Sequence, residues 1–155
     1  MEAMIVVAIV AIMATLAVPS YLEKIIRDQV VEALPLADIA KLPVALSWAA
    51  VQTFPADNAA AGLPASDKIV SNLVKSVQVQ DGAIQITFGN RANGVIKDKI
   101  LTLRPAIVAD APVVPVAWVC GYAEAPDKMT LTGQNRTNIP ANFLPFSCRA
   151  KSGVK

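Results

Sequence analysis

The sequence predicts an α+β fold, in which a long N-terminal helix packs on a four-stranded antiparallel sheet and a disulfide-closed loop forms the C-terminal end. Three observations predict it. An uncharged N-terminal run continues into a segment with helical spacing, alternating runs flank an Asp81-Gly82 turn, and Cys120 and Cys148 bracket an irregular loop. Short links between alternating runs favour an antiparallel sheet, whose apolar face the helix would cover.

Residues 3–22 contain no charged side chain, and Glu2 stands directly before them. As a helix these residues reach about 30 Å, enough to cross the hydrocarbon core of a bilayer. A carboxylate that enters lipid unpaired costs several kcal/mol, so Glu2 requires a partner. The run therefore predicts a membrane anchor that also serves in assembly.

Two other interpretations of this run are weaker. A secretory signal needs a basic start, a shorter apolar core and a small-residue cleavage site, whereas this chain starts with Met1-Glu2 and the run is too long. A buried core helix of a soluble domain would carry a polar stripe, which residues 3–22 lack.

Composition limits the classes of function. The 155 residues leave room for the apolar segment, residues 1–22, and one domain of residues 23–155 that includes the second half of the helix. A net charge of +2 is too mild to indicate nucleic-acid binding. The absence of histidine removes Ser-His-Asp and Cys-His catalysis and histidine-ligated zinc. We predict no enzymatic activity, no catalytic residue, no metal and no cofactor.

The segment from residue 23 to about residue 52 has helical character. Glu23 with Arg27 and Lys24 with Asp28 are opposite charges four residues apart, which suits an exposed helix face. A mostly apolar stripe follows helical spacing through Leu22, Ile25, Ile26, Gln29, Ala33, Leu36, Ala37, Ala40, Val44, Ser47 and Val51.

Three prolines interrupt this helix. Pro19 lies near the expected membrane edge, where a kink is tolerable. Pro35 and Pro43 lie further along, and each forfeits a backbone hydrogen bond. We expect a bend or break at one of them, and the helix ends at Thr53-Phe54-Pro55.

Four strands are expected after the helix. Residues 77–80 and 83–88 alternate around Asp81-Gly82, a strong hairpin signal, and residues 100–103 and 116–120 follow. Residues 106–115 are expected as a connection, and residues 66–74 as a short helix. The polar side of the sheet would carry Gln78, Gln80, Gln85 and Thr87.

The C-terminal part, residues 121–155, lacks clear periodicity and needs a fastening. An even pair of cysteines, late in a chain that crosses a membrane early, indicates one disulfide formed in an oxidising compartment. Closing the span from Cys120 to Cys148 removes roughly 3.5 kcal/mol of unfolded-chain entropy.

Several segments together resemble the type IV pilins, the subunits of bacterial surface filaments. They are residues 2–14 (EAMIVVAIVAIMA) with 19–21 (PSY), residues 29–33 (QVVEA), residues 53–63 (TFPADNAAAGL), residues 118–120 (WVC) and residues 142–149 (NFLPFSCR). The resemblance covers nearly the whole chain and implies the pilin fold, a non-enzymatic structural role, and adhesion, twitching motility or DNA uptake as the filament's task.

The resemblance also implies an assembly. Apolar helix halves leave the inner membrane and bundle in the core of a homo-oligomeric extracellular filament, and Glu2 neutralises the N-terminal amine of a neighbouring subunit. The residues it assigns to assembly are Glu2, Met4, Ile5, Val6, Val7, Ile9 and Pro19. Implied partners are the type IV pilus assembly machinery and prepilin peptidase, with DNA or a host surface as further candidates. A pilin precursor carries a basic leader and a few residues before the glutamate, so we expect a methylated mature N-terminus ahead of Glu2.

Three alternatives remain open at this point. A DNA-binding minor pilin would need a basic stripe, and the candidates are Lys128, Arg136, Arg149, Lys151 and Lys155 in the tail. Aromatic side chains do not alternate regularly with them, as a base-stacking surface would require, which favours solvated charges. A pseudopilin of type II secretion fits the N-terminal segment but not the cysteine-bounded ending. A membrane-anchored periplasmic enzyme would need a nucleophile motif that the sequence lacks.

Overall fold

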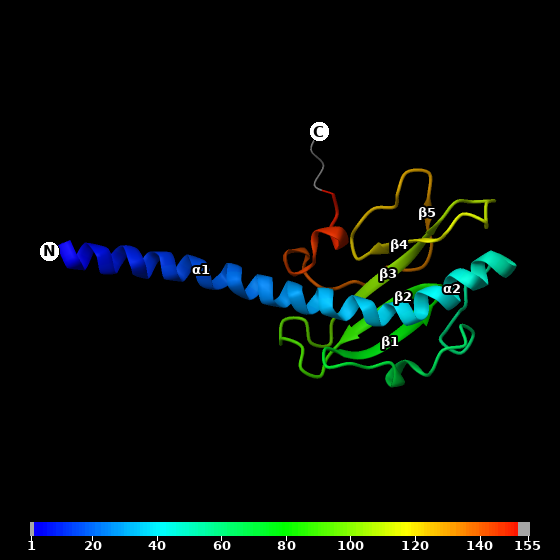
Figure 1. Ribbon diagram of the computed structural model, residues 1–155, viewed down its shortest axis with the longest axis horizontal. Coiled ribbons are helices and arrows are strands. Elements are labelled where there is room, and N and C mark those ends of the chain that lie inside the picture. Colours follow the sequence, from blue (N-terminus) through cyan, green and yellow to red (C-terminus); the bar gives the residue numbers. More distant parts are fainter. Residues whose placement is uncertain (1, 152–155) are drawn as a thin grey trace.

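In the computed structural model, which describes residues 2–151 apart from the side chains of Glu2, Leu16 and Ala17, a long helical arm lies across an antiparallel sheet (Figure 1). The arm consists of α1 (Glu2–Ala33), a 3-10 turn η1 (Leu34–Ala37) and α2 (Asp38–Val51). The N-terminal half of α1 projects well beyond the sheet, while its second half and α2 cover one face of it.

The predicted interruption of the helix occurs at Pro35. This proline lies in the first positions of η1, where its missing N–H costs least. Pro43 lies inside α2 and Pro19 inside α1, and both helices continue through them. The prediction of a break at Pro35 or Pro43 is thus confirmed at Pro35.

One stripe of small and branched side chains runs along the second half of α1, η1 and α2 and meets the sheet. Its buried members are Ile26, Val30, Ala33, Ala37, Ala40 and Val44, spaced by three or four residues. The alanines are completely or almost completely buried, so the helix backbone approaches the sheet closely. Leu22 and Val51, at the ends of the predicted stripe, are exposed.

The predicted four antiparallel strands are present in the order β1-β2-β3-β4, with a short fifth strand beside β3. The strands are β1 (Val74–Gln80), β2 (Ala83–Phe88), β3 (Ile100–Ile107), β4 (Ala117–Cys120) and β5 (Thr130–Leu131). The Asp81-Gly82 hairpin is confirmed, because Gln80 pairs with Ala83. Register places Val79, Ile84, Leu103 and Cys120 in one row across the sheet. This row belongs to the core under the helix.

Two predicted boundaries were wrong. Residues 66–74 do not form a helix beyond the 3-10 turn η2 (Ser66–Lys68), and β1 begins at Val74. Strand β3 continues to Ile107 through Pro105, into the stretch expected as a connection. The carbonyl of Pro105 accepts hydrogen bonds from the N–H and the hydroxyl of Thr132. Because the N–H and C=O of a strand residue point to the same side, the N–H that proline lacks would point to this side as well. The pairing with β2 on this side has already ended at Leu103, so no ladder hydrogen bond to β2 is lost.

The predicted polar face is also partly wrong, because Gln85 is buried while Gln78 is exposed. The C-terminal segment lies over this face of β2 and β3. A Cβ on Gly133 would lie 2.8 Å from the Cβ of Ala83, and the N–H of Arg136 donates to the hydroxyl of the buried Thr102. Gln85 is satisfied under this cover by donating from Nε2 to Oε1 of Gln80 at 3.0 Å.

Candidate assembly surface

The first part of α1 is the largest exposed apolar surface in the described structure. Met4, Ile5 and Val7 expose 79%, 62% and 68% of their surface. Val6 and Ile9, also assigned to assembly, are exposed as well, and so is Pro19. The structure therefore leaves the described members of the predicted set without contacts to the sheet domain.

These exposed side chains surround the helix. Met4, Ile5, Val6 and Val7 follow one another in the chain, and successive helical residues point about 100° apart. Residues 3–22 therefore have no polar stripe. Even Thr15 turns its hydroxyl inward, donating from Oγ1 to the carbonyl of Ile12 at 2.7 Å. A helix that is apolar on every side has to be surrounded, either by lipid or by other apolar helices.

This helix is also long and apolar enough to cross a membrane, judged by length and composition. The side chain of Glu2, which the sequence assigns to subunit pairing, lies outside the described part of the chain; its backbone belongs to α1.

Two loops of the sheet domain grip α1 just beyond the apolar run. On one side, Asn142 in the 3-10 turn η3 (Ala141–Phe143) donates from Nδ2 to Oε1 of Glu23 at 3.1 Å, and its carbonyl accepts from Nη2 of Arg27 at 2.9 Å. On the other, the N–H of Asn93 donates to Oε1 of Gln29 at 2.9 Å. These contacts fix the direction in which the free half of α1 leaves the domain.

The same contacts correct the predicted charge pairs on the helix. Glu23 and Arg27 both bind Asn142 rather than each other, and Lys24 with Asp28 forms no ion pair either. In the described part of the chain the ion pairs are Asp38 with Lys41 and Lys75 with Asp98. The spacing of residues along the sequence does not mark Asn142 as a helix contact, because its partners on α1 lie more than a hundred residues away.

An exposed aromatic ring lies beside the contacts between Asn142 and α1. Phe146, in the 3-10 turn η4 (Phe146–Cys148), exposes 80% of its surface. The guanidinium carbons of Arg27 and Arg149 lie 5.8 Å and 4.6 Å from the centre of its ring. Arg149 also donates to the carbonyls of Leu144 and Asn142. Two cations and one ring therefore join the C-terminal loop to the helix.

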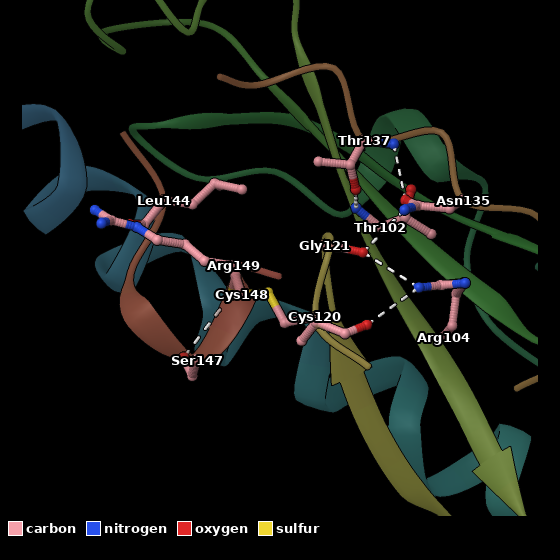
Figure 2. Close-up of a disulfide and its surroundings, with 11 residues drawn as sticks. Thr102, Arg104, Cys120, Gly121, Asn135, Thr137, Leu144, Ser147, Cys148 and Arg149 are labelled. Carbon is pink, nitrogen blue, oxygen red and sulfur yellow. Dashed lines mark hydrogen bonds between the residues drawn. A yellow bond between two sulfur atoms is a disulfide. The ribbon is translucent and has the colours of Figure 1, made fainter. Parts of the chain in front are cut away.

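The predicted disulfide joins Cys120, at the end of β4, to Cys148 in η4 (Figure 2). The turn after Cys120 depends on Gly121, which has a positive φ of 57°; a Cβ there would lie 2.8 Å from the carbonyl oxygen of Cys148. The carbonyl of Gly121 accepts from Arg104 and from Asn135, the latter at 2.9 Å. Burial lowers the pKa of the Arg104 guanidinium. The C-terminal loop is thus bonded to the sheet on both sides of the disulfide.

Asn58, which sequence reasoning did not single out, fastens the loop after α2. It is buried, and its side chain bonds the outer edge of β1: Oδ1 accepts from the N–H of Val79 at 2.6 Å and Nδ2 donates to the carbonyl of Val77 at 3.1 Å. A second bond from Nδ2 reaches the carbonyl of Pro64. The side-chain amide occupies the place of a neighbouring strand's peptide group and closes a free sheet edge.

The sequence contains no histidine, and the described residues include no group of three or more His, Cys, Asp or Glu side chains placed to hold a metal. The site that this chain presents is a surface for association: an apolar helix held rigidly at its base by a disulfide-closed domain.

Comparison with known proteins agrees with a role in association through this helix. Residues 27–149 match the family model described as "Pilin (bacterial filament)". A "Fimbrial protein" of Neisseria meningitidis serogroup B (strain ATCC BAA-335 / MC58) is 33% identical over 160 residues, covering 97% of this chain and 92% of that protein. A "Type IV major pilin protein PilE1" of Neisseria gonorrhoeae is 35% identical over 154 residues, covering 96% and 83%. "Fimbrial protein EcpC" of Eikenella corrodens is 33% identical over 153 residues, covering 96% and 86%.

The fold defines a class of protein, namely a subunit that associates with other molecules through an exposed apolar helix. The chain belongs to the pilin family of bacterial filament proteins. The family resemblance and the predicted fold are both confirmed.

Proposed function

We propose that this chain is the structural subunit of a bacterial type IV pilus and that it polymerises by burying the first half of α1 between copies of itself. One observation carries the proposal. Residues 3–22 form a helix that is apolar on every side, and none of the most apolar stretch of the helix is buried within the subunit. Relatives named fimbrial protein and type IV major pilin support the same role.

In this proposal residues 1–22 are the unit that exchanges lipid for other subunits, and residues 23–155 form the wall of the filament. Met4, Ile5, Val6, Val7 and Ile9 supply the contact area. Glu2 sets the register by neutralising the N-terminal amine of a neighbouring copy, since an unpaired carboxylate in that dry core would be strongly destabilising. Before assembly the helix anchors the subunit in the inner membrane, where prepilin peptidase and the assembly machinery act on it.

The two alternative roles have weaker support. The relatives bear the names of fimbrial and major pilin proteins, which does not favour a pseudopilin or a DNA-binding minor pilin. Within the basic tail, Arg149 is engaged by Asn142, Leu144 and the Phe146 ring, so it is not free for a phosphate. Lys155 lies outside the described residues.

The experiment compares Val7→Lys with Val113→Lys in the bacterium that makes the protein. Both changes put a lysine on an exposed valine; Val7 is on the free helix and Val113, 94% exposed, is on the loop between β3 and β4. A lysine in an apolar helix costs about 3 kcal/mol when it is buried in lipid, and a comparable penalty is expected between apolar helices. We expect Val7→Lys to be absent from filaments sheared off the cells and Val113→Lys to be present in them.

Each variant is also quantified in the membrane fraction, so that loss of filaments is distinguished from loss of the protein. Normal filaments from Val7→Lys, equal in amount to those of Val113→Lys, would show that the free helix is not buried on assembly.

A further inference from the structure

The two loops that grip α1 lie at a defined depth relative to the apolar run. Asn142 contacts Glu23 and Arg27, and Asn93 contacts Gln29. At 1.5 Å of rise per residue, these contact points lie within about 10 Å of Leu22, the last residue of the uncharged run. If residues 3–22 fill the hydrocarbon core, the headgroup layer covers about the next 5–7 Å on that side.

The C-terminal loop therefore lies at the level of the lipid headgroups when the subunit is anchored, and the loop after β2 contacts α1 just outside that layer. In Figure 1 the loop after β2 and the C-terminal loop flank α1, one on each side, at the end of the domain from which the free helix projects. No other part of the domain is nearer to the membrane along the helix axis in this view.

This end of the domain is basic. The helix segment 20–29, the loop 89–98 and the C-terminal segment 140–151 contain six Lys and Arg residues and three Asp and Glu residues, a net +3, whereas the whole chain carries +2. Of the three acids, Asp98 is paired with Lys75 and Glu23 bonds Asn142, which leaves Asp28. Four of the basic side chains are exposed and have no hydrogen bond or ion pair within the described residues: Lys24, Arg91, Lys97 and Lys151.

Two exposed aromatic rings lie at the same level. Tyr21 exposes 65% of its surface at the end of the apolar run, and Phe146 exposes 80% between two guanidinium groups. Aromatic rings next to basic side chains are typical of protein surfaces at the membrane–water interface.

We propose that this basic, aromatic end of the domain, formed by Lys24, Arg91, Lys97, Phe146 and Lys151, docks on anionic phospholipid headgroups and holds the anchored subunit upright before assembly. The inference rests on the proposed function, because it requires residues 3–22 to span a membrane. Leaving the membrane then requires these charges to exchange headgroups for solvent or for other subunits.

The test uses the full chain reconstituted in lipid vesicles, with Phe146→Trp as the reporter. Tryptophan keeps the cation–π contacts, and Trp48 and Trp118 of the parent chain give the background. The vesicles contain a phosphocholine lipid spin-labelled at the headgroup, with or without one third phosphatidylglycerol. We expect headgroup quenching of the reporter's emission, after the parent background is subtracted, to be stronger in the vesicles with phosphatidylglycerol.

Charge neutralisation on the reporter background identifies the surface. Arg91→Gln with Lys97→Gln removes two exposed cations from the proposed surface, and Lys128→Gln with Arg136→Gln removes two exposed cations elsewhere. Each basic group near an anionic membrane changes the docking equilibrium about fivefold. The first pair should therefore lower docking about 25-fold and abolish the extra quenching, and the second pair should leave it unchanged.

Quenching that is equal in both lipid mixtures, or equally lost in both double variants, would overturn the docking surface. Resistance of the protein to alkaline extraction is measured on the same vesicles. A chain that is extracted does not span the bilayer, which would overturn the anchor and with it this inference. A chain that stays inserted but shows no lipid-dependent quenching would overturn the docking surface alone.

Discussion

Replacing Asn58 by alanine tests how the domain closes its free sheet edge. Within the described sheet, strand β1 pairs with β2 alone. The Asn58 side chain takes the place of the missing neighbour by bonding Val77 and Val79, and it also bonds Pro64 in its own loop. Asn58→Ala removes all these bonds at a buried position and leaves two carbonyls and one N–H without their partner.

The magnitude follows from the bonds that are lost. Each hydrogen bond contributes about 1 kcal/mol net, and a buried group left unsatisfied costs roughly 1–3 kcal/mol. Water reaches part of this edge once the amide is gone, so the lower values apply and we expect a loss of about 3 kcal/mol in the free energy of unfolding. For a domain of this size that corresponds to a lowering of Tm by about 10 °C.

Urea unfolding of the full chain in detergent solution, followed by tryptophan fluorescence, measures this loss. Trp48 stacks on Phe54 at 5.1 Å between ring centres, close to the Asn58 loop, and is therefore a local reporter. Asn72→Ala is the matched control, because Asn72 is exposed and its side chain makes no hydrogen bond within the described structure. The control should stay within about 0.5 kcal/mol of the parent. If Asn58→Ala were as stable as the control, the edge-closing role would be refuted.

Two further predictions concern the hairpin and the disulfide. Gly82→Ala should destabilise the domain by about 2 kcal/mol or more, because Gly82 has a φ of +80° and a Cβ there would lie 2.6 Å from Cγ of Phe54. Gly94→Ala, with nothing within 4 Å of the added Cβ, is its control in the same unfolding assay, and equal midpoints for the two variants would contradict the prediction. Replacing Cys120 and Cys148 together by alanine reopens a span of 28 residues, which should cost about 3.5 kcal/mol. An unchanged urea midpoint for this double variant would show that the hydrogen bonds of Arg104, Asn135 and Arg149 hold the loop without the disulfide.

Much of the fold could be predicted from local sequence signals. The Asp81-Gly82 turn fixes the register of the hairpin because the side-chain period of strands is two. The uncharged run defines the free half of α1, and Pro35 and Pro43 predicted an interruption of the helix, which occurs at Pro35. Where only two cysteines exist, their pairing follows once both lie in an oxidising compartment.

The rest depended on contacts between segments distant in sequence. Gln85 has the polarity of an exposed strand residue, and only the C-terminal segment that crosses β2 buries it. Strand β5 is two residues long and is defined by its pairing with β3, so its own sequence carries no strand signal. Asn58 and Asn142 lie in segments with the composition of loops. The role of Asn58 depends on the edge of β1 and the role of Asn142 on helix α1, and both elements are distant from them in sequence.

For the assembly surface, the sequence identified an apolar run without a polar stripe. The structure added that this half of α1 projects from the sheet domain and that two loops of the domain contact the helix just beyond the run. The basic end of the domain could not be predicted, because Lys24, Arg91 and Lys151 come from three separate segments.

The central claim, burial of the first half of α1 between copies, is tested most directly by methionine oxidation in intact filaments. Met4 and Met13 lie on the free helix and are exposed in the subunit by 79% and 65%, while Met129 lies half-buried beside β5. Peroxide oxidises accessible methionine to its sulfoxide, and mass spectrometry of peptides from treated filaments gives the rate at each site. The account predicts that Met129 is oxidised while Met4 and Met13 are protected. Oxidation of Met4 and Met13 as fast as that of Met129 would contradict it.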